Sequence, residues 1–483
     1  MEVPATQQEV AGFLARLTGQ GVVETHISAV FLGDGEALKL KKAVALGFLD
    51  FTALAERERL LRRECAINAP YAPGLYLGVE PITRGPDGAP RLGGGGPALD
   101  WVLRMKRLPA DAFLDARPCP EGAMLDALAD SVAAMHAVQP VLAGPDRLRP
   151  VIDGNLAAMR EAGVPAAAAQ GWHRAASAEH ARLSPWLDAR GAQGFRRRCH
   201  GDLHLGNICL LEGRPVPFDA LEFDEALAGI DVGYDLAFLL MDLEQRHGRP
   251  AANRVLNRYV ARGGDAALVR GLPLWLSLRA VIRAHVQARR GQEWRGLLDA
   301  AMAYLAPRAP RLLAIGGLQG TGKSTLARQL APQIGPAPGA LILRSDDTRK
   351  RLAGVAPETR LAAEHYTAGA SVAVFAEMRA MAAAALEGGH AAILDAVFAR
   401  PEEREAAAAL HPSFTGLWLE APLDTLRARV SARKGDASDA DVAVLETSAA
   451  RDPGPIVWQR IDAASGTEAM ARKALDLLPF ASP

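Results

Sequence analysis

A Gly-rich segment in the C-terminal third of the chain has the residue types that bind a phosphate chain. Residues 317–324 read GLQGTGKS, which fits the pattern GxxxxGK[ST] between an expected strand and an expected helix. In that setting, backbone N–H groups and the helix N-terminus face an anion. Lys323 would reach the β- and γ-phosphates, and the Ser324 hydroxyl would hold Mg²⁺. We predict a nucleotide site made by Gly317, Leu318, Gln319, Gly320, Thr321, Gly322, Lys323, Ser324 and Thr325.

Charged residues follow the next strands of the same region. Asp346 comes just after an expected strand, where it could take a proton from an acceptor hydroxyl, while Arg349 could hold an anionic part of that acceptor. Helix capping would explain the aspartate equally well. Asp395 ends another strand and could orient the Mg²⁺ shell. Arg429 and Arg433 lie four residues apart, as in a lid over phosphates or in a solvated helix face.

A second set of such residues lies near the middle of the chain, where residues 200–207 read HGDLHLGN. Phosphoryl transfer needs a carboxylate that positions the acceptor hydroxyl and oxygen ligands that hold Mg²⁺. Asp202 would supply the first, and Asn207 and Asp219 the second. His200 and His204 also have a spacing found in zinc sites, although a tight Gly-containing loop suits catalysis better than a ligand-bearing helix.

This second region resembles the aminoglycoside phosphotransferase and choline-kinase-like family, whose fold is that of protein kinases. The resemblance rests on the HGDxxxxN loop and on the later DVGYDLA stretch at residues 231–237. It implies that Asp202 is the catalytic base, that Asn207 and Asp219 hold metal, and that Asp235 braces the catalytic loop.

In that family a strand lysine pairs with a helix glutamate to hold the α- and β-phosphates. Lys39 and Lys41 point to the same face of one expected strand, so either could be that lysine. We predict Lys39, with Glu64 as its partner and Met105 at the adenine-contacting hinge. The loop at residues 31–36 contains GxG without the full GxGxxG, which departs from the pattern of nucleotide-covering loops.

The C-terminal region resembles P-loop kinases that include polynucleotide 5′-hydroxyl kinases, gluconate-type kinases and zeta-toxin-like kinases. The shared features are SDDTR after the second strand, LDAVFARPEER after the third, and the arginine lid. The resemblance implies Asp346 as general base, Arg349 on the substrate phosphate, and Arg433 with Arg429 in the lid. The tandem order resembles bacterial proteins labelled bifunctional aminoglycoside phosphotransferase/ATP-binding protein.

The elements that must position these residues fall into about three folding units for a chain of 483 residues. We predict a kinase-like N-lobe at residues 1–108, a helical C-lobe at 109–305, a Pro-containing linker at 306–310 and a P-loop domain at 311–483. The fold class is then an α+β two-lobed protein-kinase-like domain followed by an α/β domain with a parallel sheet. A Gly- and Pro-rich run at residues 84–97 is expected to be a long hairpin.

Composition narrows the functional classes. Lys+Arg and Asp+Glu are both 55, and a net charge of +0 argues against a protein that coats nucleic acid or an anionic membrane. The four cysteines form neither CxxC nor zinc spacing, which suggests a reducing cytoplasm. The N-terminus lacks the pattern of a signal peptide. We therefore expect a cytoplasmic protein without a membrane partner.

These inferences predict a bifunctional ATP- and Mg²⁺-dependent phosphotransferase, in which each module phosphorylates a hydroxyl acceptor. The acceptor would be a small molecule, such as a sugar or an antibiotic-like compound, in the N-terminal half. It would be a small anionic metabolite or a nucleic-acid 5′-hydroxyl in the C-terminal half. The alternative is a regulatory ATP-binding protein with one weakly active module. A polycationic acceptor would need an acidic cleft, for which the candidates are Glu222, Asp224, Glu225, Asp242 and Glu244.

Overall fold

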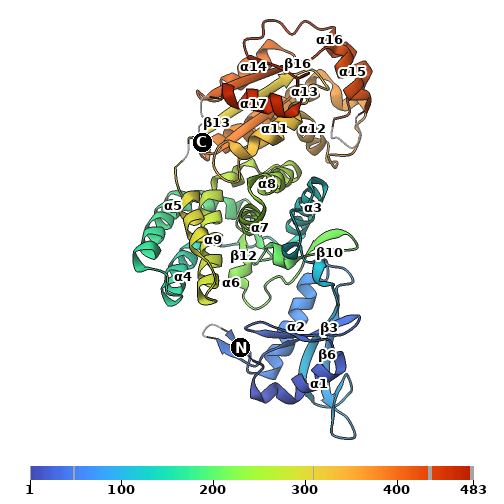
Figure 1. Ribbon diagram of the computed structural model, residues 1–483, viewed down its shortest axis with the longest axis vertical. Helices are drawn as coiled ribbons and strands as arrows, with labels where there is room; N and C mark the ends of the chain where they lie inside the picture. Colours follow the sequence, from blue (N-terminus) through green and yellow to red (C-terminus); the bar gives the residue numbers. More distant parts are fainter. Residues whose placement is uncertain (1, 47–48, 308, 433–437, 479–483) are drawn as a thin grey trace. The chain divides into compact units, whose positions relative to one another are not determined.

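The computed structural model describes residues 2–46, 49–307, 309–432 and 438–478, and it divides into two compact units (Figure 1). The first unit comprises residues 1–120, 134–143 and 191–235, and the second comprises 121–133, 144–190 and 236–483. The predicted boundaries between lobes and linker stay predictions.

The first unit contains a six-stranded antiparallel sheet. Its strands, in spatial order, are β1 (Val22–Glu24), β2 (Ser28–Leu32), β3 (Glu36–Lys41), β8 (Ala98–Lys106), β6 (Tyr76–Arg84) and β7 (Pro90–Leu92). The Gly-rich run joins the antiparallel neighbours β6 and β8, so the predicted hairpin is present.

Strand β3 separates an apolar face from a charged one, because side chains alternate along a strand. Leu38 and Leu40 are buried in a cluster with α1 (Gln8–Thr18). The intervening lysines point to the opposite side, where α2 (Leu54–Asn68) packs on β6 and β8. This alternation brings Lys39 and Lys41 of β3 toward Glu64 of α2.

The rest of the first unit carries the HGDLHLGN loop between short paired strands. Hairpin strands β10 (Ile208–Leu211) and β11 (Arg214–Pro217) follow the loop directly. Strands β9 (Arg196–Arg198) and β12 (Gly229–Asp231) pair on its other side. The smaller elements are β4 (Ala45–Leu46), β5 (Leu49–Asp50) and α6 (Glu225–Ala228).

Helices dominate the chain between and after these strands. They are α3 (Gly122–Val138), α4 (Leu148–Glu161), α5 (Ala166–Ala192), α7 (Val232–His247), α8 (Arg249–Gly263), α9 (Leu272–Arg289) and α10 (Arg295–Tyr304). Of these, α3, α5 and α7 contribute residues to both units, whereas the other four belong to the second unit.

The second unit also contains a five-stranded, fully parallel sheet with helices on both sides (Figure 1). In spatial order its strands are β14 (Leu341–Arg344), β15 (Ala391–Asp395), β13 (Arg311–Gly317), β16 (Phe414–Glu420) and β17 (Gln459–Asp462). Its helices are α11 (Lys323–Leu330), α12 (Ser345–Leu352), α13 (Ala368–Glu387), α14 (Pro401–Ala408), α15 (Leu423–Ala432), α16 (Val442–Ala449) and α17 (Thr467–Leu477). Because all strands run the same way, their carboxyl ends meet at one edge, where ligands of such sheets bind.

Edge strand β14 is held by side-chain amides of α8 within the same unit. Asn253 Nδ2 donates to the Ala340 carbonyl oxygen at 3.1 Å, and Asn257 Oδ1 accepts the Ile342 N–H at 2.6 Å. These bonds satisfy backbone groups that an edge strand would otherwise leave unpaired. Since α12 begins where β14 ends, they also fix the start of the helix that carries Asp346.

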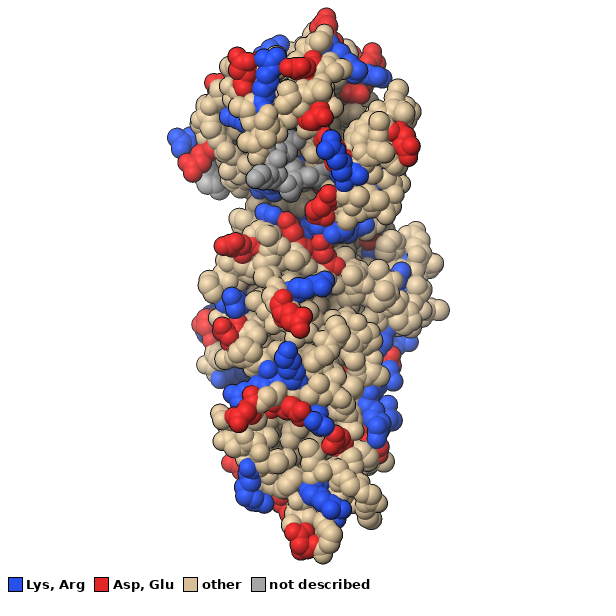
Figure 2. Space-filling model, turned by 90° about the vertical axis from the view of Figure 1, so that its right-hand side faces the viewer, with Lys and Arg blue, Asp and Glu red and all other residues tan. Residues whose placement is uncertain are grey.

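Among the described residues, α13 is the one helix long and apolar enough to cross a membrane by length and composition. It contacts β13, β14 and β15 and buries Val374, Met378 and Met381. Figure 2 shows Lys and Arg side chains interspersed with Asp and Glu over one face of the protein, in keeping with the zero net charge.

Candidate active sites

The first site is a network of charged side chains between β3, α2 and the segment after β11. Lys39 Nζ lies 2.7 Å from Glu64 Oε1 and 2.6 Å from Asp219 Oδ1. Burial would lower the pKa of Lys39, but the carboxylates of Asp219 and Glu64 hold it well above its usual value. Burial would raise the pKa of Asp219, but Lys39 lowers it to about 2. Both groups are therefore charged at neutral pH.

Asp202 and Asn207 meet within the HGDLHLGN loop. Asn207 Nδ2 donates to the Asp202 backbone oxygen at 2.9 Å and to its Oδ2 at 3.0 Å. The Asp202 side chain is 40% exposed, so this carboxylate is held in place while remaining accessible to a ligand. The sequence predicted roles for both residues, and the structure brings them together.

The two histidines of this loop have partners that fix the loop itself. His200 is buried, its Nδ1 accepts the Asp202 N–H at 3.3 Å, and its Nε2 lies 2.8 Å from the Phe218 carbonyl oxygen. Burial lowers the pKa of His200, so its neutral ring is the favoured form. His204 Nδ1 accepts the Gly206 N–H. These bonds give the pair a structural role that needs no zinc.

Asp235 braces the same loop from α7. Its carboxylate accepts the backbone N–H groups of His200 at 3.0 Å and Gly201 at 2.9 Å, and lies 3.1 Å from His136 Nε2. Gly201 has φ +84°, and a Cβ there would come within 2.7 Å of Leu221 Cδ1. The Gly in HGD is thus required by both conformation and space.

Met105 lies near the end of β8, opposite Ala37 of β3, at the position predicted for the hinge. Two residues later, Arg107 ties down the β2–β3 turn: its backbone N–H donates to Gly35 O at 3.0 Å and its Nη1 to Gly33 O at 2.6 Å. The GxG segment is therefore a short turn anchored by Arg107.

The acidic residues considered for binding a polycationic acceptor all have partners within the protein. Glu222 pairs with Lys41, Asp224 caps α6, Glu225 pairs with Arg63, Asp242 with Arg246, and Glu244 with Arg249. These pairings account for the acidic composition of the region without a cationic ligand.

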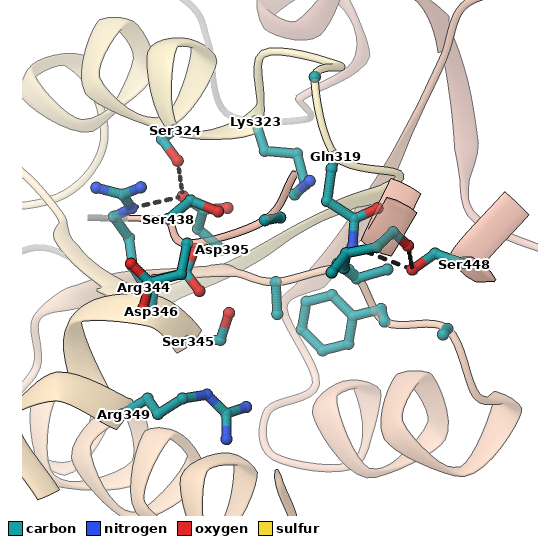
Figure 3. Close-up of a pocket in the computed structure, with 18 of the residues that line it drawn as sticks. Gln319, Lys323, Ser324, Arg344, Ser345, Asp346, Arg349, Asp395, Ser438 and Ser448 are labelled. Carbon is teal, nitrogen blue, oxygen red and sulfur yellow. Dashed lines mark hydrogen bonds and ion pairs between the residues drawn. The ribbon is translucent and has the colours of Figure 1, made fainter. Parts of the chain in front are cut away.

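The second site is a cavity of about 900 Å³ at the carboxyl edge of the parallel sheet (Figure 3). Residues from the Gly-rich loop and from the ends of β14 and β15 point into it. The predicted residues that line it are Gln319, Gly320, Gly322, Lys323, Ser324, Thr325, Asp346, Arg349, Asp395 and Arg429. Gly317, Leu318 and Thr321 belong to the same loop, and Arg433 lies outside the described residues.

The loop that precedes α11 is shaped by its glycines and by bonds to its carbonyl groups. Gly317 has φ +132°, and a Cβ there would come within 2.5 Å of the Leu419 carbonyl oxygen, so no other residue fits. Lys323 Nζ donates to the carbonyl oxygens of Gly317 and Leu318, both at 2.9 Å. Gln319 Nε2 donates to Ser448 Oγ at 3.2 Å (Figure 3).

Ser324, Asp395 and Asp346 place three side-chain oxygens at the floor of the cavity. The Ser324 hydroxyl donates to Asp395 Oδ2 at 2.6 Å, and Arg344 Nε lies 3.4 Å from the same oxygen (Figure 3). Burial raises the pKa of Asp346, and the nearby charges of Asp395 and Asp347 raise it further against the opposing effect of Arg344. Perturbation of this kind is common in catalytic carboxylates.

Arg349 lines the cavity and is held there by neutral groups. Its guanidinium lies 4.8 Å from the centre of the Tyr366 ring, and it donates to the His365 carbonyl oxygen at 2.5 Å and to Ser371 Oγ at 3.4 Å. Its buried Nε has no hydrogen-bond partner in the described part of the chain. Arg429 lies on α15, and its Nη1 donates to the Ala463 carbonyl oxygen at 3.0 Å.

Asp439 and Phe398 line this cavity but were not among the site residues predicted from the sequence. Asp439 accepts hydrogen bonds from Lys350 at 2.9 Å, from the Leu361 N–H at 3.0 Å and from the Tyr366 hydroxyl at 2.5 Å. Phe398 adopts φ +52°, which is uncommon for a bulky residue, and it is buried. In the sequence, the position of Phe398 within the LDAVFARPEER stretch was the one signal for that residue, and no local motif marks Asp439.

Two family models match separate parts of the chain. The one described as "Phosphotransferase enzyme family" matches residues 90–274, and the one described as "AAA domain" matches residues 312–453. They confirm the expected order of a kinase-like module followed by a P-loop module. Together with the parallel sheet, they confirm the predicted fold class and show that the chain is a kinase.

Similarity to known solved structures is more distant. A choline/ethanolamine kinase family protein from Mesorhizobium loti is 15% identical and covers 62% of this chain and 93% of its own, with a TM-score of 0.36. A gluconokinase from Sinorhizobium meliloti is 20% identical and covers 35% of this chain and 93% of its own, with a TM-score of 0.27.

Two mycobacterial proteins match almost the whole length. The uncharacterized protein Rv2004c of Mycobacterium tuberculosis and the uncharacterized protein Mb2027c of Mycobacterium bovis are each 30% identical over 486 aligned positions. The alignment covers 92% of this chain and 93% of each relative. The chain therefore belongs to the family of these mycobacterial proteins, as a kinase in which an aminoglycoside-phosphotransferase-like module precedes a P-loop module.

Proposed function

We propose that both modules are ATP- and Mg²⁺-dependent phosphotransferases, each of which transfers the γ-phosphoryl group to a hydroxyl acceptor. The observation that carries this proposal is that each site combines a lysine, oxygen ligands suited to Mg²⁺ and an accessible carboxylate. In the first site these are Lys39, Asp219 with Asn207, and Asp202. In the second they are Lys323, Ser324 with Asp395, and Asp346.

In the first site, Asp202 accepts the proton of the acceptor hydroxyl as its oxygen bonds to the γ-phosphorus, and the bond to the β–γ bridging oxygen breaks to release ADP. Lys39 binds the α- and β-phosphates, and Glu64 orients it from 2.7 Å. Asn207 keeps the Asp202 carboxylate directed toward the acceptor. Tethering the base in this way reduces the freedom lost on reaching the transition state.

In the second site, Lys323 and the backbone of the Gly-rich loop bind the β- and γ-phosphates. Asp346 accepts the proton of the acceptor hydroxyl, and its raised pKa makes it a stronger base than an ordinary carboxylate. Arg349 binds an anionic group of the acceptor and so sets the distance between its hydroxyl and Asp346. Arg429 adds positive charge from α15.

The donor set at each site fits Mg²⁺, which prefers oxygen ligands. Asp219 and Asn207 would hold it in the first site, and Ser324 and Asp395, already 2.6 Å apart, in the second. When bound, the ion neutralises the charge that develops between the β- and γ-phosphates.

The acceptor of the second site is best explained as a small anionic metabolite. Three of the four basic residues near Asp346 pair with carboxylates: Arg344 with Asp395, Lys350 with Asp439, and Arg351 with Glu377. Arg349 is instead held by neutral groups, so its charge is available to one anion rather than to a long nucleic-acid backbone. For the first site, the internally paired acidic residues favour a neutral or weakly charged hydroxyl compound over a polycationic aminoglycoside.

An acceptor screen tests the proposal. ADP release by the full chain is measured with sugars, sugar acids, aminoglycosides and 5′-hydroxyl oligonucleotides, for wild type and for Asp202→Asn and Asp346→Asn. Each substitution is expected to lower turnover of its own acceptor by about 10²–10⁴-fold and to leave the other unchanged. Turnover that survives both substitutions would refute the assignment of the two bases.

The short, anchored β2–β3 turn favours a second candidate function, a nucleotide sensor in the first module that regulates the second. Calorimetry with an ATP analogue, together with an acceptor-dependent turnover assay, distinguishes a sensor from a kinase in the first module when Lys323→Ala silences the P-loop site. A sensor binds the analogue in this background without acceptor-dependent turnover at the first site, whereas a kinase shows both.

We also infer a cytoplasmic location. The cysteines Cys65, Cys119, Cys199 and Cys209 are all free thiols, as a reducing compartment allows. Cell fractionation tests this inference, and recovery in a membrane or extracellular fraction would contradict it.

A further inference from the structure

A second lysine lies beside Lys39 in the first site and has no role in the proposed reaction. Lys41 is 1% exposed, and its Nζ lies 3.1 Å from Glu64 Oε2 and 2.6 Å from Glu222 Oε1. The ring of Phe51 lies 5.9 Å from the same ammonium group. Lysine is rarely buried unless it is paired, and the two carboxylates of Glu64 and Glu222 make the burial of Lys41 possible.

Lys41 shares the carboxylate of Glu64 with Lys39. Glu64 is fully buried, and each of its oxygens binds one lysine: Oε1 binds Lys39 and Oε2 binds Lys41. The orientation of Glu64 is therefore set from both sides. If one lysine moves, the other still holds the carboxylate.

The two lysines also attach one segment of chain to β3 at two points. Asp219 binds Lys39, and Glu222, three residues later, binds Lys41. Asp219 must release Lys39 when the lysine binds phosphate and the carboxylate holds metal. The Lys41–Glu222 pair is then the attachment that remains, and because both side chains are buried, removing either one would leave an uncompensated charge.

The formal charges of the cluster support the same conclusion. Two lysines and three carboxylates, Glu64, Asp219 and Glu222, leave one net negative charge. Without Lys41, Lys39 would face three carboxylates alone and would be drawn away from nucleotide phosphates.

We propose that Lys41 is a positioning residue of the first site: paired with Glu222, it holds Glu64 and the Asp219 segment in place while Lys39 moves to the nucleotide. The inference rests on the proposed kinase function of this module. It predicts that losing the pair weakens metal-dependent nucleotide binding through Asp219, without a change in any residue that touches the ligand.

The test uses the full chain with Lys323→Ala, so that the first site alone binds nucleotide. Calorimetry gives the affinity for an ATP analogue and the Mg²⁺ concentration at half-saturation, and thermal unfolding gives Tm. Lys41→Met removes the pair, and Lys41→Arg retains the charge. The double variant Lys41→Met/Glu222→Leu removes the pair but restores the net charge and leaves no unpaired Glu222, so it serves if the single variant does not fold.

Lys42→Met is the matched control. Lys42 is the next residue, is fully buried and pairs with Glu24 at 2.7 Å, a different carboxylate from those that pair with Lys39 and Lys41. The Lys42→Met variant should have a lower Tm, as Lys41→Met does, but its half-saturating Mg²⁺ concentration should stay near that of the Lys323→Ala parent.

We expect Lys41→Met and the double variant to raise the half-saturating Mg²⁺ concentration by about tenfold or more, the range typical of residues that support metal ligands. Lys41→Arg should keep the half-saturating Mg²⁺ concentration close to that of the Lys323→Ala parent. Values for both Met-containing variants within about twofold of the Lys42→Met control would refute the inference. If the parent itself shows no Mg²⁺-dependent binding that Lys39→Met abolishes, the proposed function of the module fails instead.

Discussion

Replacing Asp346 by Asn tests the chemistry of the P-loop module most directly. The change keeps the size of the side chain and its capacity for hydrogen bonds but removes the group that accepts the acceptor proton. Loss of a general base costs about 10²–10⁴-fold in rate, equivalent to about 3–5 kcal/mol of activation free energy. The upper half of that range is expected, because burial and the neighbouring charges of Asp395 and Asp347 raise the pKa of Asp346.

Asp347 provides a control that differs by one position. Both aspartates lie in the first turn of α12, where a negative charge interacts favourably with the helix N-terminus. Asp347 pairs with Arg344 at 3.8 Å and is outside the residues that line the cavity. Asp347→Asn should therefore keep turnover within about threefold of wild type.

The assay is ADP release with a saturating acceptor in the Asp202→Asn background, measured across pH. The base must be deprotonated, so the rate falls as pH drops through the pKa of Asp346. Because that pKa is raised, the fall should lie above pH 3.9, the ordinary value for Asp. Asp347→Asn removes a neighbouring negative charge and should move the fall to lower pH. Equal turnover in Asp346→Asn and Asp347→Asn would show that Asp346 only supports the helix.

Three further predictions concern single side chains. Arg349→Lys loses the planar guanidinium and should raise the KM for an anionic acceptor by about tenfold with little effect on the KM for ATP; equal changes in both would contradict its role. Asp439→Asn leaves the buried ammonium of Lys350 without its carboxylate and should lower the free energy of unfolding by about 3 kcal/mol, seen as a lower Tm. Burial lowers the pKa of His285 to about 4, so the fold favours its neutral form. The resulting contribution to the free energy of unfolding, up to about 3 kcal/mol, is present above pH 6.5 and is lost as the pH falls toward 4. His285→Gln should reduce the acid-induced fall in Tm, and an unchanged fall would rule out this residue as its cause.

The sequence predicted the parallel sheet well because buried parallel strands are short, continuous apolar runs. The apolar run at residues 312–315 lies within β13 (Arg311–Gly317), and the run at 392–394 lies within β15 (Ala391–Asp395). The residues that follow such strands must meet at one edge, so Ser324 and Asp395 could be assigned to one site before their 2.6 Å contact was known.

Contacts between distant parts of the chain could not be predicted in the same way. Asp439 is 89 residues from Lys350, and neither lies in a motif that marks the other. The choice between Lys39 and Lys41 was also open, because strand alternation gives both the same face. Only the positions of Asp219 and Glu222 distinguish the lysine that faces the metal ligand from the one that holds the segment.

Net charge and charge available to a ligand are different quantities in this protein. A basic side chain paired with a carboxylate is largely neutralised, whereas one held by a carbonyl oxygen or an aromatic ring keeps its charge. Lys41 and Lys350 belong to the first kind and are 1% exposed. Arg349 belongs to the second, since its described partners are a carbonyl oxygen, a serine hydroxyl and a tyrosine ring. A chain of zero net charge can therefore still hold anions at the sheet edge, because the partner of each base decides whether its charge reaches the ligand.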